Sequence, residues 1–94
     1  MTPEQYVEIN NKLELKHRNL SKELHSLQKM RKHLVIKERM CRKKGQIQQH
    51  AHVCDIIVDA NDEVDTITKA LITNHKQMKK LNMQYAHLVK ELSQ

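Results

Sequence analysis

Three residues near the middle of the chain have side chains that commonly bind zinc. Cys41, His50 and Cys54 supply two sulfur atoms and a ring nitrogen, which are the usual ligands of structural zinc sites. On a helix, His50 and Cys54 share a face because they are four residues apart. A reversal of the chain after Cys41 would bring all three together, with His33 or His52 as a distant fourth ligand.

The spacing of these residues nevertheless argues against a metal site. Structural zinc sites have four protein ligands and usually contain paired spacings such as CxxC, and the chain has no such pair. The simpler interpretation is ordinary packing near a bend, with both cysteines reduced inside the cell. We therefore expect no metal ion and no other cofactor.

Catalysis is not indicated either. Asp55, Asp59, Asp62 and Glu63 follow one helix surface at three- and four-residue spacing. They are similar to half of a carboxylate site in a helical bundle, but the Glu-x-x-His partner is missing. No nucleophile elbow and no glycine-rich phosphate loop is present. We expect no enzymatic activity and no small-molecule substrate.

A basic run is the main candidate for binding nucleic acid. Residues 29–44 contain eight Lys or Arg and one Glu, a net charge of +7 in a chain of net charge +6. The candidate contacts to nucleic acid or to an acidic partner are Lys37, Arg39, Arg42, Lys43 and Lys44. Such residues bind the phosphate backbone of nucleic acids and also occur in nuclear import signals. No aromatic residue separates them to stack bases, so any binding would be weakly sequence-specific. The alternative is a solvated helix end.

Neither the histidines nor the apolar stripes indicate a further function. The seven histidines are spread along the chain, which favours solvated helix faces over a pH switch. The apolar stripes lack Trp or Phe at their edges, which suits partner helices better than a membrane surface. No signal peptide and no membrane-spanning segment is expected. We predict an intracellular protein that is nuclear or cytoplasmic, with the nucleus slightly favoured.

The composition predicts long helices. One Gly and one Pro in 94 residues exclude a sandwich or barrel, which needs a turn every 8 to 12 residues. A helix start is indicated at Thr2, which can cap free amides and is followed by Pro3 and, three residues after the cap, by Gln5. An apolar residue then recurs at every seventh position: Tyr6, Leu13, Leu20, Leu27, Leu34 and Cys41.

The second half of the chain has a cleaner coiled-coil pattern. We assign heptad position a to His50, Ile57, Val64, Leu71, Met78, Tyr85 and Leu92, and position d to Val53, Ala60, Ile67, Asn74, Leu81 and Leu88. Asn74 either sets the register, as a polar residue in a seam often does, or faces out. In the first half, position d is patchy, with Ile9 and Met30 but also Lys16, Glu23 and Lys37.

The two heptad frames do not join, which places a break at Gly45. Basic residues followed by glycine are typical of a helix C-terminus. The sequence predicts one helical-hairpin domain over residues 1–94, with a helix over 3–44, a turn near Gly45 and a helix over 47–92. A reversal there also sets the acidic run 55–65 opposite the basic run 29–37. The alternatives are a further break at 59–62 and one uninterrupted helix.

We thus expect an all-α, long antiparallel hairpin of the coiled-coil type that completes a four-helix bundle by dimerisation or by docking on helices of another protein. Its function would be assembly within a larger complex. The alternative is a dimeric hairpin that binds nucleic acid through its basic tip, and a monomeric hairpin is the simplest case. The predicted protein interface consists of Tyr6, Leu13, Leu20, Leu27, Leu34, Ile57, Val64, Leu71, Asn74, Met78, Leu81, Tyr85, Leu88 and Leu92.

Overall fold

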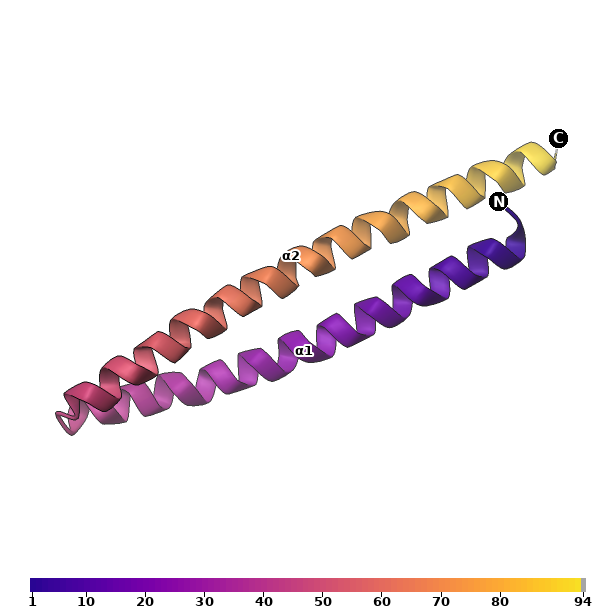
Figure 1. The fold of residues 1–94 in the computed structure, drawn as a ribbon. Coiled ribbons are helices and arrows are strands. Elements are labelled where there is room, and N and C mark those ends of the chain that lie inside the picture. The colour runs from indigo at the N-terminus through magenta and orange to yellow at the C-terminus, as the bar shows by residue number, and fades with distance from the viewer. Residues whose placement is uncertain (94) are drawn as a thin grey trace. The chain divides into compact units, whose positions relative to one another are not determined.

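Two long helices joined by a short turn form the computed structural model, which describes residues 1–93 (Figure 1). α1 is Pro3–Lys43 and α2 is Ile47–Leu92. The described residues contain no strand, so the predicted all-α class and the two-helix hairpin are confirmed. α2 runs without interruption, so the alternative break at 59–62 is wrong, as is one continuous helix through Gly45.

α1 begins at the predicted capping box. The Gln5 amide donates to Thr2 Oγ1 at 3.2 Å, and the Thr2 amide donates to Gln5 Oε1 at 3.0 Å. The Tyr6 amide donates to the Thr2 carbonyl at 3.0 Å and starts the helical ladder. These bonds satisfy amide groups that have no partner within the first turn of a helix.

The turn is a glycine-capped helix end. Gly45 has a φ of 68°, in the left-handed region that residues with a Cβ rarely adopt. The amides of Gly45 and Gln46 donate to the carbonyls of Arg42 and Cys41 at 3.2 and 3.0 Å, the paired bonds of a Schellman motif. α1 ends at Lys43, one residue before the predicted end, because Lys44 belongs to the turn.

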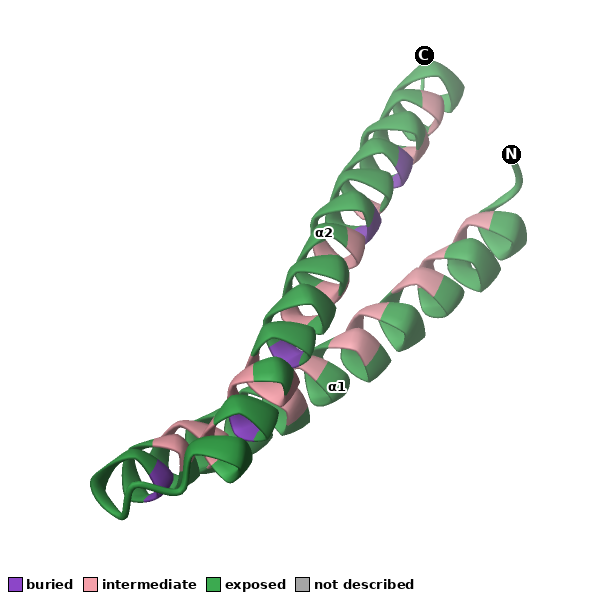
Figure 2. Ribbon diagram, turned by 60° about the vertical axis from the view of Figure 1, so that its left-hand side comes forward, coloured by how far each residue is buried: buried purple, intermediate pink, exposed green. Residues whose placement is uncertain are grey.

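The chain divides into two compact units. The turn unit consists of Lys22–Thr68, and the terminal unit consists of Met1–Ser21 with the chain from Lys69 onward. In the turn unit the buried residues are Cys41, Val53 and Ala60; in the terminal unit they are Asn74 and Leu81 (Figure 2). All five belong to the heptad positions assigned from the sequence, so the heptad pattern identifies the side of each helix that is buried.

Two stripes of covered residues follow α1. The main stripe is the predicted one: Tyr6, Leu13, Leu20, Leu27, Leu34 and Cys41. The second stripe lies one residue beyond the d positions predicted for it. The predicted d residues Ile9, Lys16, Glu23, Met30 and Lys37 are all exposed. The half-buried residues are instead Asn10, His17, Leu24 and Glu38, each four residues after a member of the main stripe. The predicted positions hold two lysines and a glutamate, whose burial would cost more than burial of Asn, His and Leu, and the one carboxylate of the observed stripe, Glu38, is paired with His50. Because a residue four positions after d is the next a, the main stripe of α1 occupies heptad position d and the second stripe occupies position a.

The predicted charge pairing between the helices is not formed at contact distance. Among residues 1–93, the ion pairs of Lys or Arg with Asp or Glu are Lys12 with Glu8 and Arg42 with Glu38, both within α1. All five acidic residues between 55 and 65 are exposed. They occupy outward-facing positions on α2, so the acidic and basic runs remain available to solvent.

Candidate assembly interface and turn cluster

In the terminal unit, two tyrosines predicted as interface residues stack against each other. The rings of Tyr6 and Tyr85 lie 4.0 Å apart at an interplanar angle of 12°. The Tyr6 hydroxyl donates to Asn82 Oδ1 at 2.6 Å. Asn82 was not predicted from the sequence, because it lies outside the a and d positions. The stacked pair joins the start of α1 to the end of α2.

Asn74 is buried in the seam of the terminal unit rather than turned outward. Its side chain is 1% exposed, and its Nδ2 donates to the backbone carbonyl of Leu13 on α1 at 2.9 Å. Its Oδ1 is buried without a hydrogen-bond partner, as is Nδ1 of His17. A polar seam residue that reaches one particular carbonyl favours one register, in line with the register role predicted for it.

Most of the predicted interface residues are already covered within the hairpin. Asn74 and Leu81 are buried, and Leu92 is 84% exposed. The remaining members are half-buried: Tyr6, Leu13, Leu20, Leu27, Leu34, Ile57, Val64, Leu71, Met78, Tyr85 and Leu88. The heptad stripes thus form the seam between α1 and α2 of one chain, and the parts of these side chains that stay exposed remain open to a partner.

Apolar side chains outside the seam are exposed on both helices of the turn unit. On α1, Ile36 and Met40 are 52% and 51% exposed; on α2, Ile47 and Val58 are 82% and 56% exposed. Shallow grooves run along α1. One has a volume of about 530 Å³ and is lined by Gln28, Arg31, Lys32, Val35, Ile36 and Arg39. This groove combines the aliphatic side chains of Val35 and Ile36 with a cationic rim.

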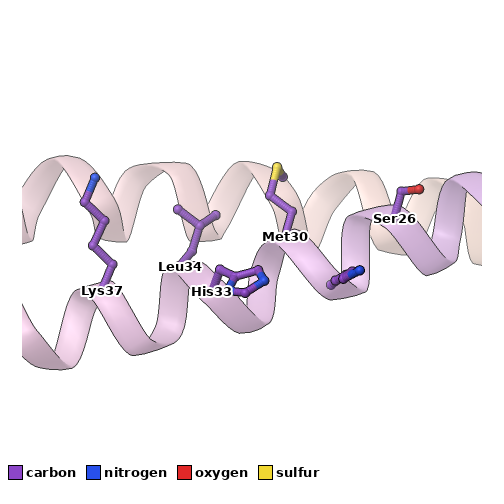
Figure 3. A pocket seen from close by; sticks show the side chains of 6 residues that line it. Ser26, Met30, His33, Leu34 and Lys37 are labelled. Carbon is purple, nitrogen blue, oxygen red and sulfur yellow. The ribbon is translucent and has the colours of Figure 1, made fainter.

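The groove drawn in Figure 3 lies on the other side of the α1 seam. Met30, His33, Leu34 and Lys37 line it together with Ser26 and Lys29. Leu34 belongs to the main stripe, and its neighbours His33 and Val35 project to opposite sides because successive residues of a helix are about 100° apart. Val35 lines the first groove and His33 the second. Both faces beside the seam are therefore apolar and basic on α1.

The basic residues predicted to contact nucleic acid surround the turn. Lys37, Arg39, Arg42, Lys43 and Lys44 are all exposed. Of these, Arg42 lies near a carboxylate, with its Nε 3.7 Å from Glu38 Oε1. The acidic run on α2 contacts none of the five within 4.0 Å in the described chain, so the tip has a positive surplus.

A cluster of potential metal ligands links the two helices beside the turn. His50 Nε2 donates to Glu38 Oε1 at 2.8 Å, and Cys54 Sγ lies 3.8 Å from the same nitrogen. One ligand atom of each residue lies within 4.8 Å of the others. The side chains of Glu38 and His50 are 18% and 32% exposed. Three different ligand types thus converge in a partly buried position.

The composition of this cluster differs from the trio considered in the sequence. His50 and Cys54 do meet, but Glu38 takes the place of Cys41, which is buried and lines a neighbouring cavity of about 140 Å³ together with His50. His33 and His52 are exposed and outside the cluster. Glu38 was missed because the second stripe of α1 was placed one residue too early. Its spacing of four residues from Leu34 was the available signal.

The electrostatics of the cluster favour an ionised carboxylate. The hydrogen bond from His50 lowers the pKa of the Glu38 carboxyl below its usual value of 4.5. Partial burial acts in the opposite direction, and the positive charges of Arg42 and Arg39 act with the hydrogen bond. Glu38 is therefore an anionic acceptor at neutral pH, able to bind a proton donor or a cation.

No family model, curated protein or solved structure matches this chain. Within the described residues, neither helix has a stretch long and apolar enough to cross a membrane.

Proposed function

We propose that this chain is a non-enzymatic assembly module in which two copies pair their hairpins into a four-helix bundle. The observation that carries the proposal is the unpartnered apolar surface outside the seam. In the turn unit, Ile36, Met40, Ile47 and Val58 are each more than half exposed, although large aliphatic side chains are among those most often buried. A second copy packed over them would remove this apolar surface from water.

Charge complementarity favours a second copy as the partner. On α1, Lys32, Ile36 and Arg39 are exposed at the spacing i, i+4, i+7; on α2, Val58, Asp62 and Asp65 are exposed at the same spacing. Such spacing places each trio on one helix face. A two-fold axis perpendicular to the hairpin, at the level of Lys32 and Val58, sets α1 of one copy parallel to α2 of the other, so the basic stripe meets the acidic one.

A charge-exchange experiment tests the pairing. One variant carries Lys32→Glu with Arg39→Glu, and a second carries Asp62→Lys with Asp65→Lys. Each alone sets like charges against each other in a homodimer, whereas an equimolar mixture restores opposite charges. In light scattering coupled to size exclusion, we expect a dimer for the original chain, weakened dimers for each variant and a dimer for the mixture.

The control carries Lys12→Glu with Lys16→Glu, an equal charge change at exposed positions of the terminal unit. It should dimerise like the original chain. An original chain that stays monomeric at all concentrations would remove the second copy as partner and leave helices of another protein. A mixture no better than its components would show that these stripes do not face each other.

The second candidate function is weakly specific binding of nucleic acid by the dimer, favoured by the positive surplus at the tip. Each phosphate contact contributes about 0.9 to the slope of log affinity against log salt. Replacing Arg42, Lys43 and Lys44 by alanine should weaken binding of DNA or RNA of any sequence and flatten that slope. The matched control replaces Lys76, Lys79 and Lys80, which are also exposed. Equal effects in both variants would contradict a site at the tip.

A further inference from the structure

We propose that Glu38, His50 and Cys54 form a zinc-binding site that ties the end of α1 to the start of α2. The three side chains come from two helices on either side of the turn, and the turn fixes their separation. Their ligand atoms already lie within 4.8 Å of one another. This inference is independent of the proposed self-association, because every ligand belongs to one chain.

The donor set matches the chemistry of zinc. Thiolate, imidazole and carboxylate are all ligands of this ion, and three protein ligands with a water molecule in the fourth position form a complete tetrahedral shell. Calcium and magnesium instead prefer oxygen ligands alone. His50 Nε2 is the central donor because it lies closest to both partners, 2.8 Å from Glu38 Oε1 and 3.8 Å from Cys54 Sγ.

The two distances from His50 Nε2 need only small adjustments, and the third, from the Glu38 oxygen to Cys54 Sγ, starts below 4.8 Å. With zinc bonds of about 2.0 Å to nitrogen and oxygen and 2.3 Å to sulfur, a tetrahedral ion separates N from O by about 3.3 Å and N from S by about 3.5 Å. The Glu38 oxygen must therefore move away from the ring by about half an ångström, and the sulfur must approach by about 0.3 Å. Such shifts are within the reach of side-chain rotation.

Binding replaces protons by the ion. The Cys54 thiol loses its proton to solvent and coordinates as thiolate. His50 coordinates through Nε2 as neutral imidazole, so its ring proton moves by exchange with solvent from Nε2 to Nδ1. The carboxylate of Glu38 is already ionised and changes its partner from a proton donor to the metal. Arg42, with Nε 3.7 Å from the same carboxylate oxygen, must turn toward solvent, where its side chain is already 65% exposed.

The test uses cobalt(II) as a spectroscopic substitute for zinc in the reduced, chelator-treated chain. A cobalt–thiolate bond gives a charge-transfer absorption that oxygen and nitrogen ligands do not give. We expect this band to saturate at one equivalent per chain and to disappear when zinc is added. Cys54→Ser should abolish the band, whereas Cys41→Ser, the matched change at the buried cysteine outside the cluster, should retain it.

The two other ligands are tested through affinity. Zinc competition with a chromophoric chelator should show that His50→Ala and Glu38→Gln each weaken binding by at least about tenfold, the lower end of the loss caused even by changes outside the ligand shell. His52→Ala, an exposed histidine outside the cluster, should bind zinc like the original chain. Arg42→Ala should bind more tightly, because a neighbouring positive charge is removed.

Three results would overturn the site: no charge-transfer band at one equivalent, a band that survives Cys54→Ser, or equal losses in His50→Ala and His52→Ala. Circular dichroism of the metal-free variants identifies any that fail to fold. If His50→Ala fails to fold, Glu38→Gln still tests the site. Unchanged zinc affinity in a folded Glu38→Gln chain would show that the carboxylate is not a ligand.

Discussion

At the scale of single residues, the polar side chains in the seam are more informative than the apolar ones. Leucines at a heptad spacing fit many registers, whereas Asn74 finds its acceptor at one backbone carbonyl, that of Leu13. Glu38 similarly finds one partner on the opposite helix, His50. These contacts specify which residues of α1 and α2 lie side by side.

Asn74→Asp tests this role with almost no change of shape. The substitution removes the donor to the Leu13 carbonyl and places a carboxylate beside that oxygen in a buried position. We expect the free energy of unfolding to fall by about 2 to 3 kcal/mol, because a buried polar group then lacks its partner. Urea denaturation at neutral pH measures the change.

Asn82→Asp is the matched control for this substitution. Asn82 is exposed, and its Oδ1 accepts a hydrogen bond from Tyr6, which a carboxylate can also accept. Its effect should stay within about 0.5 kcal/mol, as for other surface changes. Equal losses in the two variants would contradict a special role for Asn74.

The Glu38 cluster predicts a pH dependence in metal-free buffer. The pKa of Glu38 is lowered in the folded chain, so the folded state holds its proton less tightly than the unfolded state. The carboxylate therefore contributes stability above its usual pKa of 4.5, and this contribution is lost as the pH falls from there through the lowered value. Thermal denaturation of Glu38→Gln should differ from that of the original chain at pH 7 and converge with it in acid. A difference that is constant with pH would contradict this account.

At the scale of elements, the turn is the part of the hairpin that the sequence predicts best. A basic last turn followed by the only glycine indicated both the helix end and the left-handed conformation. The apolar stripes were also predictable, because heptad spacing follows directly from the pitch of a helix. The second stripe of α1 was not, because Lys16, Glu23 and Lys37 compete there with Asn10 and His17 in a pattern that is polar on both sides.

Gly45→Ala isolates the conformational contribution of the turn. A Cβ added at Gly45 would have no heavy atom within 4 Å, so the substitution causes no clash. The φ of 68° remains unfavourable for alanine, by about 1 to 2 kcal/mol. We expect that loss in urea denaturation and a smaller one for Gly45→Asn, since asparagine tolerates this conformation better. Equal stability of Gly45→Ala and the original chain would show that the turn adopts another conformation.

At the scale of the whole molecule, the sequence predicts which residues form the seam between α1 and α2. It does not predict the exposed surface that would contact a partner. Periodicity reports which side chains face the seam, and the hairpin covers most of the predicted interface at least in part by itself. The exposed stripes of Lys32, Ile36 and Arg39 and of Val58, Asp62 and Asp65 became apparent only from their exposure. The metal cluster likewise depends on the pairing of Glu38 with His50, which are 12 residues apart in sequence.

Self-association predicts that thermal stability depends on concentration. If the folded chain is a dimer and the unfolded chain is not, mass action raises the Tm with protein concentration. Over a hundredfold range of concentration, circular dichroism melts should shift upward by several degrees. The shift should be smaller at high salt, because screening weakens the exposed charges. A Tm independent of concentration would indicate a monomer.

The Schellman turn also has a consequence for the order in which the chain folds. The Glu38–His50 contact closes a loop of 12 residues, whereas the Leu13–Asn74 and Tyr6–Asn82 contacts join residues 61 and 76 apart. Loop-closure entropy grows with that separation, so contacts beside the turn form first and shorten the loops that later contacts must close. The turn at Gly45 thus acts as the nucleus of the hairpin. Amide hydrogens of the terminal unit should exchange with solvent before those near the turn.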